Sequence, residues 1–182
     1  MKCFEPHPGI KVYDNVLSFS EKANIEQQCQ RIPYLIGWKD TYKSEDTGFF
    51  YHECDAQNWY DVLDNKIASE FPYILNNSEP FSQMEDRDVL RSVINCNTIA
   101  DSMTTHDHPN QDVILYYVNT EWKTEWGGET IFYDKNEKEI IFASPYVPNR
   151  MILFAGEIPH RYNSPASVAP KYRFSISTFF PR

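Results

Sequence analysis

The sequence lacks the motifs that mark several large classes of enzyme. It contains no P-loop, no glycine pattern for binding a dinucleotide and no nucleophile elbow. Its four cysteines are scattered and form no CxxC pair, so we expect reduced thiols. Positive charge is also scarce: the 17 Lys and Arg residues are outnumbered by 26 Asp and Glu residues, and the formal net charge is −9. This balance argues against a general affinity for nucleic acid and leaves only a local basic groove as a route to such binding.

Long apolar runs are missing as well. None approaches the length of a membrane span, and the first residues, Met-Lys-Cys-Phe-Glu-Pro-His, form no apolar signal segment. We therefore expect a soluble, cytoplasmic protein that does not bind a membrane.

Internal repeats, low-complexity tracts and domain linkers are also absent. A chain of 182 residues fits one domain, and a domain of this size can bury a sizeable core without disulfides. We expect residues 1–182 to form that single domain, with helical and strand support from residues 1–88 and the β core from residues 89–182.

Aromatic residues are abundant, with twelve Tyr, twelve Phe and four Trp, which favours strands over a helical bundle. In the first half, alternation predicts a strand within residues 10–17, and Ser18 or Ser20 can cap a helix that runs to about Arg31. Residues 34–51 predict a strand, a loop and a second strand. An apolar stripe predicts a second helix over residues 56–71, and we expect the two helices to cover one face of a sheet.

From residue 89 onward almost every segment alternates like a strand, and helix signals disappear. The expected strands are Leu90–Asn95, Val113–Val118, Glu129–Tyr133, Glu139–Phe142, Met151–Phe154 and Arg173–Phe180. Many short antiparallel strands separated by turns are typical of a jelly roll or a sandwich, so we predict a mainly β fold with flanking helices.

Two histidines, His106 and His108, stand one residue apart in the segment Thr-His-Asp-His-Pro-Asn-Gln-Asp. On an extended backbone their side chains point to the same side and can bind one metal ion, since imidazole is a ligand for several transition metals. A third histidine, His160, follows about fifty residues later. Taken alone the pair is a weak signal, because a surface loop of this kind can satisfy its histidines with ordinary hydrogen bonds.

The last predicted strand carries a second candidate group. Arg173 and Ser175 share one face of it, while Phe174 and Ile176 share the other, so the polar pair can face the interior of a barrel. A buried guanidinium needs an anion, and a bidentate carboxylate meets that need. The alternative is a solvated arginine in a surface ion pair.

Taken together and in this order, these segments resemble the iron(II)- and 2-oxoglutarate-dependent dioxygenases, in the branch similar to prolyl 4-hydroxylase. The resemblance covers residues 93–180 most clearly and is compatible with most of the chain. The residues that carry it are His106–His108, Leu115–Asn119, Trp122, Trp126–Thr130, Arg150–Phe154, Ile158–His160 and Arg173–Ser175. What it implies is a double-stranded β-helix, a jelly-roll core with the metal near one open end.

In that family a His-x-Asp or His-x-Glu pair and a distal histidine hold the iron. The resemblance places His106 in the first position and His160 in the distal one, and the carboxylate position falls on His108. Two alternatives follow. Either the site has three histidines, or Asp112 supplies the third ligand, whereas Asp107 points the other way on an extended chain.

The resemblance also implies the cofactors, Fe(II) and 2-oxoglutarate as cosubstrate, with ascorbate as an optional reductant. Arg173 and Ser175 would bind the distal carboxylate of 2-oxoglutarate, and Tyr117 would hydrogen-bond a carboxylate or serve only in core packing. The implied activity is a dioxygenase that hydroxylates a C–H bond, of a prolyl or other peptide residue or of a small molecule, while 2-oxoglutarate becomes succinate. Because His108 replaces the usual carboxylate, the alternative is a catalytically impaired jelly-roll protein that binds a peptide or sugar.

Overall fold

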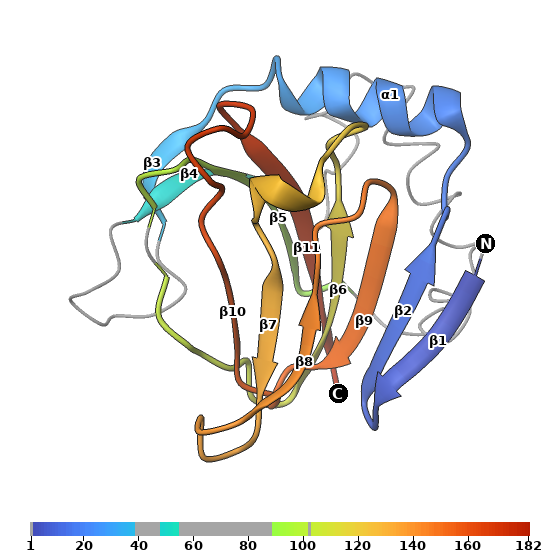
Figure 1. The fold of residues 1–182 in the computed structure, drawn as a ribbon, viewed down its shortest axis with the longest axis vertical. Helices are drawn as coiled ribbons and strands as arrows, with labels where there is room; N and C mark the ends of the chain where they lie inside the picture. The colour runs from blue at the N-terminus through green and yellow to red at the C-terminus, as the bar shows by residue number, and fades with distance from the viewer. Residues whose placement is uncertain (1, 39–47, 55–88, 102) are drawn as a thin grey trace.

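The computed structural model describes residues 2–38, 48–54, 89–101 and 103–182, and this part of the chain is built mainly of antiparallel strands (Figure 1). The strands are β1 Lys2–His7, β2 Ile10–Asp14, β3 Leu35–Trp38, β4 Phe49–Cys54, β5 Arg91–Asn97, β6 Gln111–Tyr117, β7 Thr130–Tyr133, β8 Ile140–Ser144, β9 Arg150–Ala155, β10 His160–Tyr162 and β11 Arg173–Pro181. The helical elements are α1 Phe19–Cys29 and the single turn η1 Thr124–Trp126.

Two sheets make up the fold. Eight strands form the larger sheet in the order β1-β2-β9-β6-β11-β5-β4-β3, and three strands form the smaller one in the order β10-β7-β8. The paired strands run antiparallel throughout. The predicted jelly roll is therefore confirmed, and each of the six strands expected after residue 89 is present with bounds shifted by a few residues at most.

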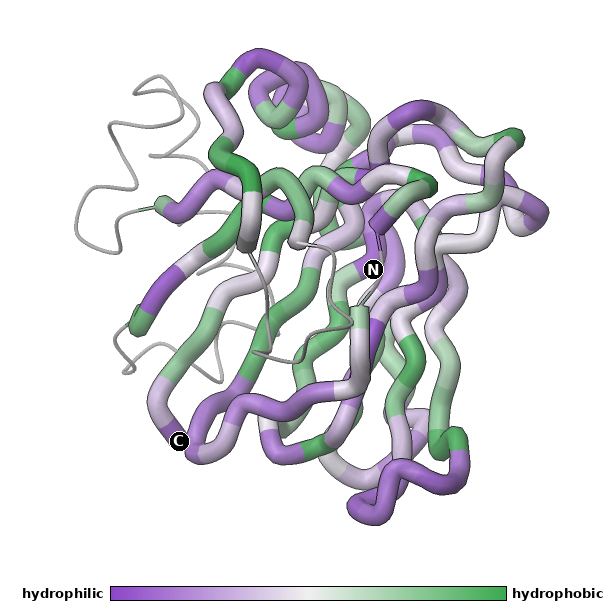
Figure 2. The backbone as a smooth tube through the Cα atoms, turned by 90° about the vertical axis from the view of Figure 1, so that its left-hand side faces the viewer, coloured by the Kyte–Doolittle hydropathy of each residue, from purple (hydrophilic) through white to green (hydrophobic). Residues whose placement is uncertain are grey.

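The central strands divide their side chains between two cores. In β6, Val113, Leu115 and Tyr117 belong to an inner core shared with the small sheet, whereas Ile114 and Tyr116 belong to an outer core. This is the two-residue alternation of a strand that is covered on both faces. In Figure 2 the hydrophobic segments gather along the strands and the hydrophilic ones in the connecting loops. The inner core lies beside the cavity described below.

Helix α1 closes the outer core, as Figure 1 shows at the upper edge of the large sheet. It begins at a capping box, in which the Ser18 side chain accepts from the Glu21 N–H and the Glu21 carboxylate accepts from the Ser18 N–H. Ile25 and Cys29 are its buried residues. The predicted helix and its cap at Ser18 are thus confirmed.

Two strands were not expected from the sequence. Strand β1 is mostly exposed at one edge of the large sheet, and β10 has only three residues. The strands of the first 54 residues extend the large sheet at both edges rather than forming a separate layer. The helix expected over residues 56–71 lies outside the described residues, so the division at residue 88 stays a prediction. In the described part of the chain, no helix is long and apolar enough to cross a membrane.

Candidate metal centre

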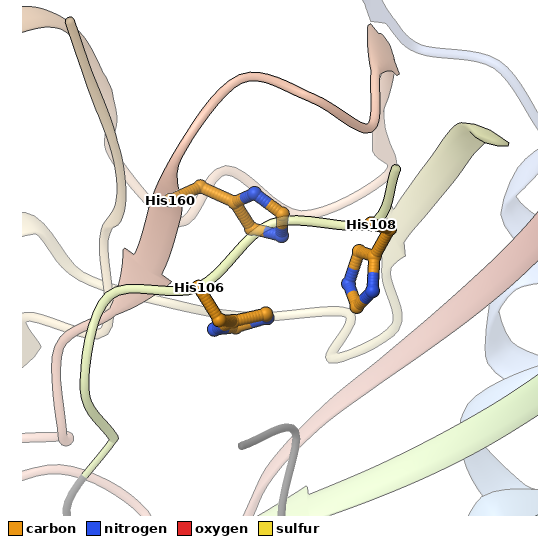
Figure 3. Close-up of side chains that lie close together, drawn as sticks. All are labelled: His106, His108 and His160. Atoms are coloured by element: carbon orange, nitrogen blue, oxygen red, sulfur yellow. The ribbon is translucent and has the colours of Figure 1, made fainter. Parts of the chain in front are cut away.

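Three buried imidazole rings, those of His106, His108 and His160, lie close together (Figure 3). His106 and His108 come from the segment before β6, and His160 is the first residue of β10. One ring nitrogen from each lies within 4.8 Å of those from the other two. The ring centres are 4.5 to 5.2 Å apart. The structure therefore brings together the three histidines singled out in the sequence, in an arrangement that could hold one metal ion.

Backbone hydrogen bonds join the segments that carry these rings. The His106 N–H donates to the His160 carbonyl at 3.0 Å, and the His160 N–H donates back to the His106 carbonyl at 2.9 Å. The His108 N–H donates to the Gly156 carbonyl at 2.7 Å. Because these hydrogen bonds fix the backbone that carries His106, His108 and His160, the three rings are positioned before any ligand binds.

Two of the rings are also oriented by carbonyl groups. Nδ1 of His160 lies 2.8 Å from the Ile158 carbonyl oxygen, and Nδ1 of His106 lies 3.2 Å from the Thr104 carbonyl oxygen. A carbonyl can only accept, so each Nδ1 is the protonated nitrogen of the neutral ring. Each Nε2 then carries a lone pair suited to a metal.

Burial favours the neutral, metal-binding form of two of these imidazoles, those of His108 and His160. Burial, with smaller contributions from His106 and Arg91, lowers the pKa of His108 to about 3. Burial, with the neighbouring His106 and His108, lowers the pKa of His160 well below its usual value. A neutral ring needs no deprotonation before it binds a metal.

No carboxylate belongs to the histidine cluster among the residues that the structure describes. Asp107 is exposed. Asp112, the alternative third ligand, lies on β6 with a carboxylate oxygen 3.8 Å from Nε of Arg182, outside the cluster. The geometry thus favours His108 over Asp112 as the third member of the group.

Arg173 lies in the cavity beside the histidines and is 1% exposed. Its Nε donates to the Gly128 carbonyl at 3.0 Å, and its Nη1 donates to Asn97 Oδ1 at 3.1 Å and to Ser175 Oγ at 3.3 Å. All three acceptors are neutral, and in the described part of the chain no carboxylate pairs with this guanidinium. A buried cation without an acidic partner is costly, so the site is suited to binding an anion.

Aromatic rings surround the same guanidinium. The rings of Tyr117, Tyr146 and Tyr162 lie with their centres 5.4, 4.9 and 5.3 Å from Cζ of Arg173, within range of cation–π attraction. The Tyr117 hydroxyl donates to Thr130 Oγ1 at 2.8 Å, and its ring stacks on Tyr146. The Tyr117 hydroxyl, which was expected to reach a cofactor, therefore donates its hydrogen bond to Thr130. Thr130 itself lines the cavity.

The cavity contains about 550 Å³ of space between its lining atoms, including the part open to solvent. Its described lining is Val93, Asn95, Asn97, Met103, His106, His108, Val113, Leu115, Thr130, Phe154, His160, Arg161, Tyr162, Arg173, Ser175, Ser177 and Phe179. No acidic side chain is among them, and the two charged residues are both arginines. Sequence reasoning did not assign Asn97, Thr130 or Arg161 to the site, although Thr130 ends the segment Trp126–Thr130 that carries the resemblance.

Comparison with known proteins agrees with this geometry. Residues 98–181 match the family model described as the 2OG-Fe(II) oxygenase superfamily. The resemblance stated from the sequence is confirmed for this part of the chain, which contains all three histidines and Arg173. The match supports an oxygenase, and the cofactors of that family, Fe(II) and 2-oxoglutarate, are those that the sequence implies. No curated protein matches the sequence.

Solved structures share the fold at low sequence identity. A prolyl hydroxylase from Trichoplax adhaerens, in complex with a peptide fragment of the oxygen degradation domain of hypoxia inducible factor, has a TM-score of 0.70 at 15% identity, covering 95% of this chain and 83% of that one. A prolyl-4-hydroxylase from Pseudomonas putida has a TM-score of 0.64 at 15% identity, covering 96% and 92%. The carbocyclase SnoK of nogalamycin biosynthesis has a TM-score of 0.67 at 13% identity, covering 95% and 79%.

Proposed function

We propose that this chain is an Fe(II)- and 2-oxoglutarate-dependent dioxygenase that hydroxylates a C–H bond. The observation that carries the proposal is the shared cavity, where three buried imidazoles and a buried guanidinium without an acidic partner face one space. The match of residues 98–181 to the oxygenase family supports the same conclusion.

In this proposal His106, His108 and His160 hold the iron through Nε2. An iron held by these three side chains would keep positions free for the cosubstrate and dioxygen, as the facial triads of non-haem iron oxygenases do. Three neutral imidazoles contribute no negative charge, so the bound metal is more positive than one held by two histidines and a carboxylate. Anionic ligands from the cosubstrate are then favoured more strongly.

Arg173 and Ser175 bind the distal carboxylate of 2-oxoglutarate. The guanidinium is held by Gly128 and Asn97 in a fixed orientation, and the Ser175 hydroxyl beside it is a further donor. Tyr117 contributes through its ring, which lies against the guanidinium, and Thr130, on the cavity wall, receives its hydroxyl hydrogen bond. Asn97 acts on Arg173 and is a positioning residue.

Iron together with 2-oxoglutarate and dioxygen supplies the oxidation of a substrate C–H bond to an alcohol, with conversion of 2-oxoglutarate to succinate and CO2. The protein binds, orients and shields these groups. Leu115, Phe154 and Phe179 give the cavity part of its apolar lining, and the rings of Phe179 and Phe154 contact those of His108 and His160.

For the substrate we propose a prolyl or other peptide residue, because structures of the same fold include prolyl hydroxylases, one of them with a peptide. A small-molecule substrate is the alternative, because SnoK, which shares the fold, is from nogalamycin biosynthesis. Ascorbate as a reductant is an additional prediction.

A second candidate function is a catalytically impaired jelly-roll protein that binds a peptide or sugar. The specific observation in its favour is that the histidine cluster includes no carboxylate among the described residues.

Succinate formation separates the two candidates. Purified protein is incubated with Fe(II), ascorbate and 2-oxo[1-14C]glutarate. The labelled CO2 released from C1 and the unlabelled succinate are both measured, with and without a peptide panel. We expect slow turnover without substrate, lost in His160→Ala. If wild-type protein forms no succinate and binds neither iron nor 2-oxoglutarate, the enzyme proposal is wrong. Binding without turnover supports the impaired protein.

A further inference from the structure

Arg161 lies at the junction between the metal cavity and a second groove. It follows His160 on β10, and together with Met103 and Tyr162 it lines both spaces. Most of the other residues that line the groove are polar, and Asp101, Glu125 and Glu129 are acidic. Arg161 therefore borders both the cavity that contains the histidines and this groove.

The Arg161 guanidinium is held in place by neutral groups. Its Nε donates to the Tyr133 hydroxyl at 2.9 Å, and its Nη1 donates to Asn163 Oδ1. Its Cζ also lies 5.9 Å from the centre of the Tyr133 ring. These contacts leave both N–H groups of Nη2 and one N–H group of Nη1 available. A carboxylate can accept two hydrogen bonds from a guanidinium edge of this kind.

The acidic residues of the groove, Asp101, Glu125 and Glu129, form no ion pair with this guanidinium. Among the described residues, none forms an ion pair with Arg161. Glu129 Oε2 accepts from Asn163 Nδ2 at 3.2 Å, so the Asn163 amide stands between the Glu129 carboxylate and Arg161. Both carboxylate oxygens of Asp101 accept from Thr98. Arg161 is thus a half-buried, oriented cation with no acidic partner in the described chain.

We propose that Arg161 binds a carboxylate of the substrate, so that this protein acts on acidic molecules. The inference rests on the proposed function and adds a substrate class to it. Arg173 is used by 2-oxoglutarate in that proposal, and no acidic side chain lines the described cavity, so Arg161 is the cation left for the substrate. The carboxylate comes from an acidic residue near the modified position of a peptide or from a small-molecule acid.

Matched acid and amide probes test this directly. Protein loaded with Mn(II) and 2-oxoglutarate under nitrogen is titrated calorimetrically with N-acetylproline and N-acetylprolinamide. A second set uses proline-containing tetrapeptides with Asp at each flanking position, each paired with its Asn counterpart. We expect at least one acid probe to bind about tenfold or more tightly than its amide, the size of one or two charge-assisted hydrogen bonds. The set that shows the preference identifies the source of the carboxylate.

Variants assign the preference to one side chain. Arg161→Gln should remove the preference for acids while leaving Mn(II) and 2-oxoglutarate affinities unchanged, and Arg161→Lys should retain part of it. Arg182→Gln is the control, since it also removes one cation but from an exposed ion pair with Glu157. Thermal unfolding of each variant checks that it is folded.

The outcomes separate this inference from the proposed function. If wild-type protein binds Mn(II) and 2-oxoglutarate but no acid probe binds better than its amide, Arg161 does not select substrate. A preference that survives in Arg161→Gln also overturns the inference. If Mn(II) and 2-oxoglutarate fail to bind, the proposed function is wrong, and the same titrations on the metal-free protein still test Arg161, because Tyr133 and Asn163 hold it without a metal.

Discussion

Gly156 occupies a position where any side chain would collide with the backbone that carries His108. A Cβ at this position would lie 2.4 Å from the His108 carbonyl oxygen and 2.6 Å from the Gln111 carbonyl oxygen. Real Cβ atoms essentially never approach other atoms closer than 3.0 Å, so the backbone of residue 156, the His108 carbonyl or both must shift by at least about 0.6 Å, the difference between 3.0 and 2.4 Å. In Gly156→Ala we therefore expect the segment that holds His108 to move.

The movement disturbs two short hydrogen bonds, from the Gly156 N–H to Gln111 and from the His108 N–H to Gly156, both 2.7 Å. Overpacking of this kind typically lowers the free energy of unfolding by about 1–3 kcal/mol. A displaced His108 should weaken metal binding by about 10- to 100-fold, the usual effect of losing a group that orients a ligand. That loss corresponds to about 1.4–2.7 kcal/mol of binding free energy.

Urea denaturation measures the stability, and titration with Mn(II) followed by electron paramagnetic resonance measures the affinity. Gly37→Ala is the matched control, because its φ of +105° strains an alanine while its Cβ would meet nothing within 4 Å. It should lower stability and leave Mn(II) affinity unchanged. A Gly156→Ala protein with normal stability would refute the packing argument. One that is destabilised but binds Mn(II) normally would refute the role of His108.

Three further predictions use other parts of the structure. Arg173→Ala should weaken 2-oxoglutarate binding at least about tenfold, the scale of a lost charge-assisted hydrogen bond, and calorimetry should show an unchanged Mn(II) affinity. Equal losses of 2-oxoglutarate and Mn(II) affinity would contradict the proposal that Arg173 binds 2-oxoglutarate and the histidines bind the metal. Asp14→Ala removes the carboxylate that accepts two hydrogen bonds from Arg150 and should lower the free energy of unfolding by about 2 kcal/mol, the scale of hydrogen bonds to a charged group. No change in this free energy would show that the pair contributes nothing. Of the four cysteines, the exposed Cys3 should be the one that reacts quickly with a disulfide reagent at pH 8. Burial raises the pKa of Cys54 and Cys96 to about 12 and raises the pKa of Cys29 as well, so these thiols should react slowly. A second fast-reacting thiol would contradict this burial.

Most of the strands that sequence reasoning found have a buried face, although β3 was also predicted and its Leu35 and Ile36 are exposed. β6, for example, is predicted from its apolar residues, and burial of both faces explains its nearly continuous apolar run. β1 was missed because its residues are exposed or only partly buried, so it carries no alternating apolar signal. β10 was missed because three residues, His160, Arg161 and Tyr162, are too few for any period to appear.

Site residues could be predicted from the sequence where they repeat a family pattern. They could not be predicted where residues distant in the sequence come together only in the folded chain. The spacing of His106 and His108 is local, and His160 was placed beside them by resemblance. Asn97 reaches Arg173 through the register of β5 with β11, in which the two residues are paired. No sequence period reveals a register between strands 76 residues apart, so residues of this kind emerge only from the structure.

The central claim is that three histidines, with no carboxylate, hold the metal. Crystals soaked in Mn(II) and 2-oxoglutarate under nitrogen, measured for anomalous scattering from manganese, test it most directly. We expect one strong peak within bonding distance of Nε2 of His106, His108 and His160, with 2-oxoglutarate extending toward Arg173. A peak bound by Asp112 or another carboxylate in place of His108, or no peak at the histidines, would contradict the claim.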